Sequence, residues 1–119
     1  MGTTKTIIKR GDVWIADLPT NSIGSVQKGE RPVLIMQNSM GNIYSETVIV
    51  VCITSKIKKM ELPVHIELLE DFLPQDSIVL GEQIMTISKE QLISKLGRIS
   101  MENQKKVDEI IKISLELLT

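Results

Sequence analysis

The sequence predicts a single, mainly β domain closed by one long C-terminal helix, a β-rich α+β fold. Short apolar or alternating runs, each of about four to eight residues, recur along the chain and are separated by turn-forming residues. Only the C-terminal segment is long and has the spacing of an amphipathic helix. A length of 119 residues suits one domain with a real core. We therefore expect a bent antiparallel sheet or partial barrel within one domain, residues 1–119.

The first half of the chain is predicted to begin with two strands separated by a long loop. Residues 11–18 alternate well enough to form the first strand. Residues 19–30 are rich in Pro, Ser, Gly and Asn, and a loop of that length in a compact domain is usually functional or disordered. Arg31-Pro32 ends the loop, and residues 33–36 are a candidate buried strand.

A turn and the central strand should follow. The pair Gly41-Asn42 marks a turn within residues 38–45. Residues 47–53 form the most β-branched run of the chain, which indicates the centre of the sheet. Cys52 lies in that run and is expected to be a buried, inert thiol. As the sole cysteine, it rules out an intrachain disulfide.

The second half is predicted to add further strands and then the helix. The expected strands are residues 62–68, 77–80 and 95–99, with a break at 73–76. Ser88 and Gln91 are spaced as a capping box that opens a short helix. Ser100 is expected to cap the long helix, residues 101–118. Its apolar stripe should consist of Val107, Ile110, Ile111, Leu115 and Leu118.

Composition limits the possible functions. The aromatic residues are only Trp14, Tyr44 and Phe72, which argues against RNA binding dominated by base stacking. The net charge is −1, but residues 1–60 carry eight Lys and Arg against four Asp and Glu, so one face could attract phosphates. No apolar run approaches the roughly 18 residues of a membrane span. A cytoplasmic protein without membrane contact is expected.

The pattern of ionisable residues argues against metal chemistry. One His and one Cys make a zinc site implausible. Asp12, Asp17, Asp76 and Glu82 follow no metal-binding spacing. His65 lies in an alternating segment with no evident orienting partner, so a structural or surface role is favoured over a catalytic one.

Two local signals suit a phosphate. Pro32 holds the preceding residue extended, so Arg31 stands at a rigid strand mouth, where a guanidinium could bind a phosphate with two hydrogen bonds. Thr54-Ser55 ends the central apolar run with two hydroxyls, which could bind a phosphate oxygen. Each also has a plain alternative: Arg31 as an exposed arginine at a strand edge, and the hydroxyls as turn contacts.

Five motifs together resemble the MazF/PemK/Kid toxins, the mRNA interferases of type II toxin–antitoxin systems. They occur in the family's order and spacing and cover nearly the whole chain. They are Lys9-Arg10-Gly11-Asp12-Val13-Trp14, Gly29-Glu30-Arg31-Pro32-Val33-Leu34-Ile35, Val50-Val51-Cys52-Ile53-Thr54, Leu62-Pro63-Val64-His65 and Glu82-Gln83-Ile84.

The resemblance implies an SH3-like partial barrel of the PemK/CcdB type, which dimerises and cuts single-stranded RNA sequence-specifically without a metal or cofactor. The ribose 2′-OH would attack the phosphorus and leave 2′,3′-cyclic phosphate and 5′-OH ends. The family's essential arginine and threonine fall on Arg31 and Thr54. Arg31 would stabilise charge and is a candidate proton donor to the 5′-oxygen. RNA-binding positions fall on Ser25, Gln27, Gly29, Ser55, Glu82 and Gln83.

The resemblance also implies partners. A MazE-like antitoxin would neutralise the enzyme by laying a C-terminal segment over the dimer groove. Operator DNA would be bound only as a complex with that antitoxin.

Three positions depart from the family pattern. Val26 replaces an acidic residue, Met85 replaces an arginine, and Gly81 replaces a bulkier apolar residue. Loss of a cation at Met85 would remove a phosphate or base contact, so no relative's RNA recognition sequence can be transferred to this chain.

Two other function classes remain open. One is a gyrase poison of the CcdB type, which uses an aromatic-containing C-terminal tail. Residues 114–119 contain no aromatic residue. The other is a catalytically silent module that binds RNA or DNA, such as an autorepressor acting with its antitoxin.

Overall fold

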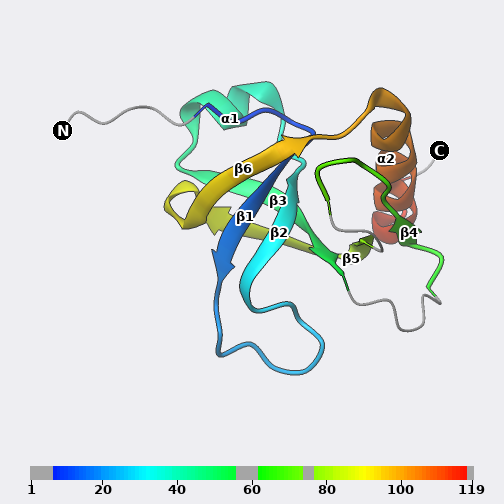
Figure 1. The fold of residues 1–119 in the computed structure, drawn as a ribbon, viewed down its shortest axis with the longest axis horizontal. Coiled ribbons are helices and arrows are strands. Elements are labelled where there is room, and N and C mark those ends of the chain that lie inside the picture. Colours follow the sequence, from blue (N-terminus) through cyan, green and yellow to red (C-terminus); the bar gives the residue numbers. More distant parts are fainter. Residues whose placement is uncertain (1–6, 56–61, 74–76, 118–119) are drawn as a thin grey trace.

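A computed structural model of the chain shows a strongly bent β-sheet with one long helix packed on its outside (Figure 1). The structure describes residues 7–55, 62–73 and 77–117. The elements, in order, are β1 (Asp12–Leu18), β2 (Gly29–Ile35), α1 (Ser39–Tyr44), β3 (Thr47–Thr54), β4 (His65–Glu67), β5 (Ile78–Ser88), the 3₁₀ helix η1 (Lys89–Gln91), β6 (Leu92–Arg98) and α2 (Met101–Leu115).

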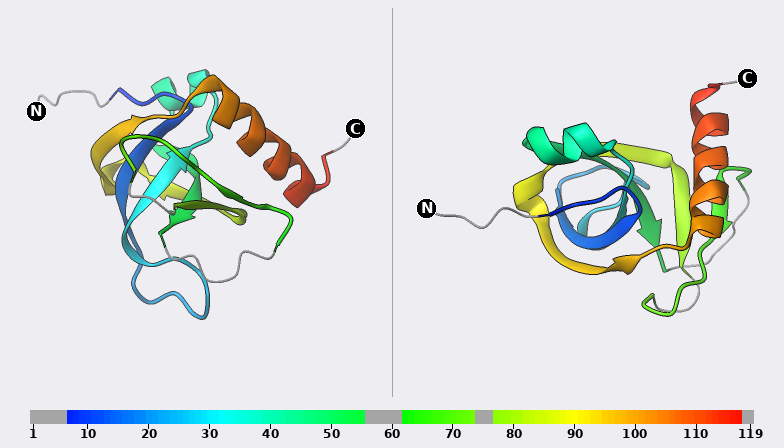
Figure 2. Two further views of the ribbon diagram at one scale, coloured as in Figure 1. Left: turned by 45° about the vertical axis from the view of Figure 1, so that its right-hand side comes forward. Right: turned by 90° about the horizontal axis from the view of Figure 1, so that it is seen from above.

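The strands of the described residues form one antiparallel sheet in the order β4-β5-β3-β2-β1-β6. β3 lies between β5 and β2, so the prediction of a central strand there is confirmed. The sheet curls into a ring, with α1 at its rim and α2 outside it (Figure 2). This confirms the mainly β fold with a C-terminal helix.

Each face of the sheet buries its own apolar cluster, because side chains alternate between the faces along every strand. α2 packs on one face, and we call the cluster there the outer core: Val13, Leu34, Val51, Ile53, Val64, Leu68, Leu73, Val79, Ile99, Val107 and Ile110. The opposite face lines the inside of the curl. We call its cluster the inner core: Ile8, Ala16, Leu18, Val33, Ile35, Val48, Val50, Cys52, Ile78, Leu80 and Ile87.

Two predictions in the first half need correction. The loop after β1 ends at Lys28, because β2 already begins at Gly29 and pairs with β1 over its first residues. The expected turn at 38–45 is instead the short helix α1. Asn38 caps this helix, since its side chain accepts a hydrogen bond from the Gly41 backbone N–H at 2.8 Å.

The second half differs more. β4 covers only His65–Glu67, shorter than the predicted strand at 62–68. β5 covers Ile78–Ser88 instead of four residues. β6 begins earlier than expected, at Leu92. The capping box is confirmed, because the Ser88 backbone N–H donates to Gln91 Oε1 at 2.8 Å and the Ser88 side chain accepts in return.

The long helix is confirmed with a shorter extent. The Ser100 hydroxyl accepts from the Asn103 backbone N–H at 3.1 Å, and α2 ends at Leu115. Val107 and Ile110 are buried, whereas Leu115 is exposed, so the predicted stripe holds in the middle of the helix but not at its C-terminal end. Leu118 and most of the predicted break at 73–76 lie outside the described residues. No helix in the described chain is long and apolar enough to cross a membrane.

Candidate active site

Arg31 and Thr54 lie at the same end of the sheet, next to the last inner-core residues of β2 and β3. β2 and β3 are paired from Ile35 with Val50 to Val33 with Cys52. Continuing that register by two residues sets Arg31 opposite Thr54. Because residues two apart share a face, both side chains lie on the inner-core face. Figure 1 places this end beside the β1–β2 loop. We call it the Arg31 end.

The Arg31 guanidinium is held by one nitrogen and leaves the others available. Its Nε donates to the Lys28 backbone oxygen at 3.1 Å, and the residue is half-buried. No other partner of this guanidinium exists among the described residues. Two parallel N–H groups of an arginine suit a phosphate. The Arg31 guanidinium is therefore held in place through Nε, and its terminal nitrogens remain available to bind a phosphate.

Thr54 marks the last position before the inner core gives way to solvent. Its side chain is 8% exposed, and Ser55 after it is exposed. Two residues earlier on the same face lies Cys52, which is fully buried as expected. Burial, with a smaller contribution from the charge of Glu82, raises the pKa of the Cys52 thiol to about 11. The Cys52 thiol, which lies beneath Thr54, therefore stays uncharged at neutral pH.

A bulge in β5 brings the Glu82-Gln83 pair to this end. On β3, Val51 pairs with Ile84 and the next residue, Cys52, already pairs with Leu80. Three residues of β5, 81–83, therefore lie opposite no β3 residue. Bulges of this kind redirect side chains and are frequent near functional sites.

Glycine at position 81 is explained by the bulge. A Cβ there would lie 2.6 Å from the Val64 backbone oxygen, which accepts the Gly81 N–H at 2.9 Å. The bulkier apolar residue of the family pattern would not fit this backbone. Met85, at the other departure, packs against the inner core.

Gln83 contacts the β1–β2 loop rather than open solvent. Its Oε1 accepts from the Gln27 backbone N–H at 2.9 Å, and its Nε2 donates to the Ser25 backbone oxygen at 2.9 Å. Gly29 follows the loop with a φ of 80°, a conformation that favours glycine. The Gln27 side-chain Oε1 is buried and has no hydrogen-bond partner in the part of the chain described.

Glu82 pairs with His65 across β5 and β4. His65 Nε2 lies 2.9 Å from Glu82 Oε1 and 3.0 Å from Oε2. His65 was expected to lack an orienting partner, and this expectation was wrong, because Glu82 is one. The structural role favoured for His65 on that ground stays a prediction; its side chain is 14% exposed.

Three of the acidic residues considered for a metal, Asp12, Asp17 and Glu82, lie in the part of the chain that the structure describes. Within the described ranges, no group of three or more His, Cys, Asp or Glu could hold an ion. Asp12 is fully buried, with Oδ2 accepting from the Lys9 backbone N–H at 2.9 Å and Oδ1 3.5 Å from Lys95 Nζ. Asp17 is exposed, and Asp76 lies outside the described residues.

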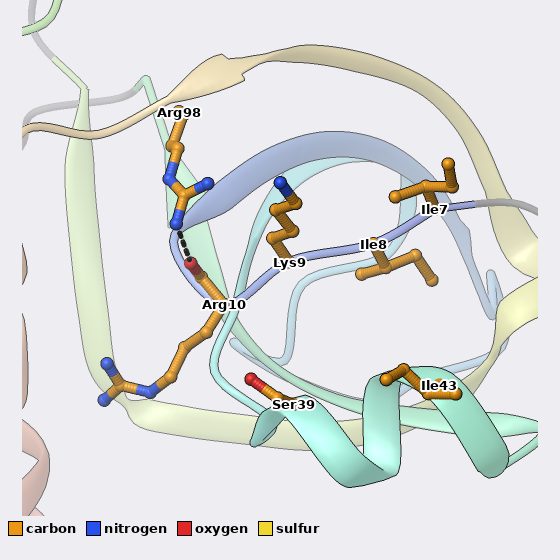
Figure 3. Close-up of a pocket in the computed structure, with 7 residues that line it drawn as sticks. All are labelled: Ile7, Ile8, Lys9, Arg10, Ser39, Ile43 and Arg98. Atoms are coloured by element: carbon orange, nitrogen blue, oxygen red, sulfur yellow. Dashed lines mark hydrogen bonds between the residues drawn. The ribbon is translucent and has the colours of Figure 1, made fainter.

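A hollow of about 340 Å³ lies at the opposite end of the strands, which we call the Arg10 end. Figure 3 shows its lining: Ile7, Ile8, Lys9, Arg10, Ser39, Ile43 and Arg98. Here the arginines are used within the fold. Arg10 Nη2 lies 2.6 Å from Asp108 Oδ1, and Arg98 Nη2 donates to the Arg10 backbone oxygen at 3.4 Å. The hollow does not include Arg31 or Thr54.

The structure thus brings most of the predicted site residues to one end. Arg31 and Thr54 face it, Gln83 joins it to the loop through Ser25 and Gln27, and Ser55 follows Thr54. Sequence analysis missed two contributors. The Lys28 carbonyl that orients Arg31 left no signal, because every residue has a carbonyl. The bulge had a signal in Gly81, since glycine inside an apolar strand is typical of a bulge.

Comparison with known proteins agrees with this fold and shows the family. Residues 9–115 match the family of PemK-like, MazF-like toxins of type II toxin–antitoxin systems. The chain is 46% identical over 114 residues to Endoribonuclease EndoA of Bacillus subtilis (strain 168), covering 94% of this chain and 97% of the relative.

Solved structures match over nearly the full length. An endoribonuclease in complex with its cognate antitoxin, from Mycobacterial species, has a TM-score of 0.76 at 23% identity, covering 94% of this chain and 98% of that one. MazF (Form-I) from Deinococcus radiodurans has a TM-score of 0.79 at 17% identity, covering 93% and 98%. The fold is that of MazF toxins. The chain belongs to the PemK/MazF family of type II toxins, which confirms the family expected from its motifs.

Proposed function

We propose that this chain, an endoribonuclease toxin of the PemK/MazF family, cuts single-stranded RNA through Arg31 and Thr54 and needs no metal ion. One observation carries the proposal: the β2–β3 register, carried two residues beyond its last pair, aligns Arg31 with Thr54 on the inner-core face, and Arg31 has a free guanidinium edge among the described residues. The 46% identity to an endoribonuclease over most of both chains supports the reaction class.

The chemistry follows from what a guanidinium and a hydroxyl can do. The ribose 2′-oxygen forms a bond to phosphorus, and the bond from phosphorus to the 5′-oxygen breaks. The 2′-OH proton is lost and the leaving 5′-oxygen gains one, so the products are a 2′,3′-cyclic phosphate and a 5′-OH. The phosphorane between them carries more negative charge than the diester, and Arg31 with Thr54 stabilises that charge.

Arg31 suits charge stabilisation rather than service as a base. A guanidinium keeps its proton at any physiological pH, so it cannot accept the 2′-OH proton. The Nε contact to Lys28 fixes the plane of the group before RNA arrives. A donor that is already oriented stabilises a transition state without a reorganisation cost. Its N–H groups can also deliver a hydrogen bond to the leaving oxygen.

The RNA is proposed to cross the Arg31 end over Ser25, Gln27, Gly29, Ser55, Glu82 and Gln83. Gln27 gives specific support. Its buried side-chain oxygen has no partner in the described chain. An unsatisfied buried acceptor costs about 1–3 kcal/mol, and this cost would be removed if the Gln27 side chain turned outward and its oxygen accepted a hydrogen bond from a base amino group.

The partners proposed with this function are a MazE-like antitoxin, a second copy of the chain, and operator DNA bound only together with the antitoxin. The antitoxin is supported by solved relatives, including a mycobacterial endoribonuclease with its cognate antitoxin and MazE-MazF of Deinococcus radiodurans. We propose a cytoplasmic location, because cellular RNA would be the substrate.

Incubation with a long single-stranded RNA in excess EDTA tests the proposal. We expect cuts at a short recurring sequence, with cyclic phosphate and 5′-OH ends identified by mass spectrometry. Binding of RNA without cuts would instead support the silent module. Impaired gyrase supercoiling without RNA cleavage would support the gyrase poison.

A further inference from the structure

The β1–β2 loop is fastened to β5 by one side chain. Gln83 uses both ends of its amide on the loop backbone, accepting from the Gln27 N–H and donating to the Ser25 carbonyl, each at 2.9 Å. These contacts join residues 56 and 58 positions apart in the sequence. Because the Gln83 amide bonds two backbone groups of the loop, it fixes where the loop lies relative to β5.

The fastened segment leads directly to Arg31. Lys28 lies one residue beyond Gln27, and its carbonyl accepts the Arg31 Nε–H at 3.1 Å. Lys28 Nζ also donates to the Gly24 carbonyl at 3.1 Å, which closes the loop on itself. Gln83 is therefore linked to the guanidinium by its hydrogen bond to Gln27, the backbone from Gln27 to Lys28, and the hydrogen bond from Arg31 to the Lys28 carbonyl.

The bulge makes this contact possible. In an unbroken antiparallel ladder, Gln83 would lie opposite Cys52, within the paired part of β5. The three extra residues release it from that register and let it reach the loop. Since both amide groups of Gln83 are occupied in this way, few of its hydrogen-bonding atoms remain to contact a base.

We propose that Gln83 is a positioning residue, which holds the β1–β2 loop so that the Lys28 carbonyl orients Arg31 for the reaction. This inference rests on the proposed function for its effect on cleavage, whereas its effect on the loop does not. It replaces a direct reading of RNA bases by Gln83 with an indirect role through the loop.

Amide hydrogen exchange in the RNA-free full chain, followed residue by residue by NMR, tests the loop contact. Gln83→Met keeps the length of the side chain and removes both hydrogen bonds. Exchange of the Gln27 amide should rise about tenfold, the effect of losing one hydrogen bond. Gln83→Glu keeps the acceptor but loses the donor, so it should deprotect the loop less, and it serves as a second variant if Gln83→Met unfolds.

Gln91 offers a matched control. It bridges two backbone groups in the same way, with Oε1 accepting from the Ser88 N–H and Nε2 donating to the Asp17 carbonyl, each at 2.8 Å. Gln91→Met should speed exchange of the Ser88 amide and leave the Gln27 amide protected.

Cleavage kinetics decide between positioning and base reading. For a positioning residue, Gln83→Met should lower kcat/KM roughly tenfold at every cut site without changing the preferred sequence, and part of the loss should appear in kcat. Unchanged Gln27 exchange, a changed sequence preference, or deprotection with unchanged cleavage would each overturn the inference. If the unaltered chain cuts no RNA, the proposed function fails, while the exchange result still decides the loop contact.

Discussion

The two ends of the bent sheet both present arginine, but they use it differently. At the Arg10 end, the terminal nitrogen of Arg10 lies 2.6 Å from Asp108, and Arg98 Nη2 donates to a backbone carbonyl. At the Arg31 end, only Nε is engaged within the described chain, with the Lys28 carbonyl at 3.1 Å. The Arg10 end, although it carries a hollow of about 340 Å³, is therefore less suited to a phosphate than the Arg31 end. The Arg31 end is the better candidate reaction centre because terminal guanidinium nitrogens are available there, even though the hollow lies at the Arg10 end.

The largest expected effect is at Arg31. Arg31→Ala should lower kcat for RNA cleavage by about 10²–10³, because a preorganised charge on the phosphorane is lost. Single-turnover cleavage of a defined RNA measures this, with thermal unfolding as a check that the fold persists. Arg10→Ala is the matched control at the opposite end and should retain cleavage. Equal losses in the two variants would show that the ends do not differ.

The thiol under Thr54 should be nearly unreactive. With its pKa raised to about 11 from an ordinary 9.0, Cys52 should react with iodoacetamide at pH 8 about a hundredfold more slowly than in the unfolded chain. The raised pKa also makes the free energy of unfolding depend on pH, in the direction opposite to that of a carboxylate whose pKa is lowered by folding. The stabilisation due to the protonated Cys52 thiol is complete below pH 9 and is lost as pH rises toward 11, because the thiol ionises first in the unfolded chain. Rapid reaction of the native chain with iodoacetamide would contradict a buried, protonated Cys52 beneath Thr54.

Thr54→Val should lower cleavage by about ten- to a hundredfold, the effect of losing a hydrogen bond to a charged group. Valine has a similar shape, so the core beneath should stay packed, and an unchanged unfolding midpoint is the control. Thr47→Val removes a threonine hydroxyl from the exposed start of the same strand and should cut normally. Full cleavage by Thr54→Val would remove this residue from the proposed mechanism.

The smallest effect is expected at the Arg10–Asp108 pair. Both side chains are more than a third exposed, and pairs of this kind contribute at most about 1 kcal/mol. Asp108→Ala should therefore lower the free energy of unfolding by less than that and leave cleavage intact. Urea unfolding measures it. A greater loss at high salt than at low salt would contradict an ion pair, since salt screens exposed charges.

The sequence predicted the parts of the fold that depend on local patterns. β1, β3, the capping box at Ser88 and the cap at Ser100 follow from alternation or from spacing of polar residues, and all are present. Features decided by distant contacts were not predicted. β5 was expected to end at Leu80, whereas pairing with β3 continues it to Ser88.

The candidate site divides in the same way. The positions of Arg31 near the start of β2 and of Thr54 at the end of β3 were readable from apolar runs bounded by polar residues. Their meeting depends on the β2–β3 register, which no local pattern specifies. The pairing of His65 with Glu82 also needs two strands brought side by side.

Because of the bulge in β5, the number of residues in this strand does not determine how its two flanks pair with β3. Residues 78–80 are aligned by one part of β3 and residues 84–88 by another, so each flank keeps its own pairing. In an ordinary strand, one inserted or deleted residue would turn every following side chain to the wrong face. Here an insertion or deletion within 81–83 would be absorbed locally. The residues of the bulge, and even their number, can thus change while the sheet that holds Arg31 stays as it is.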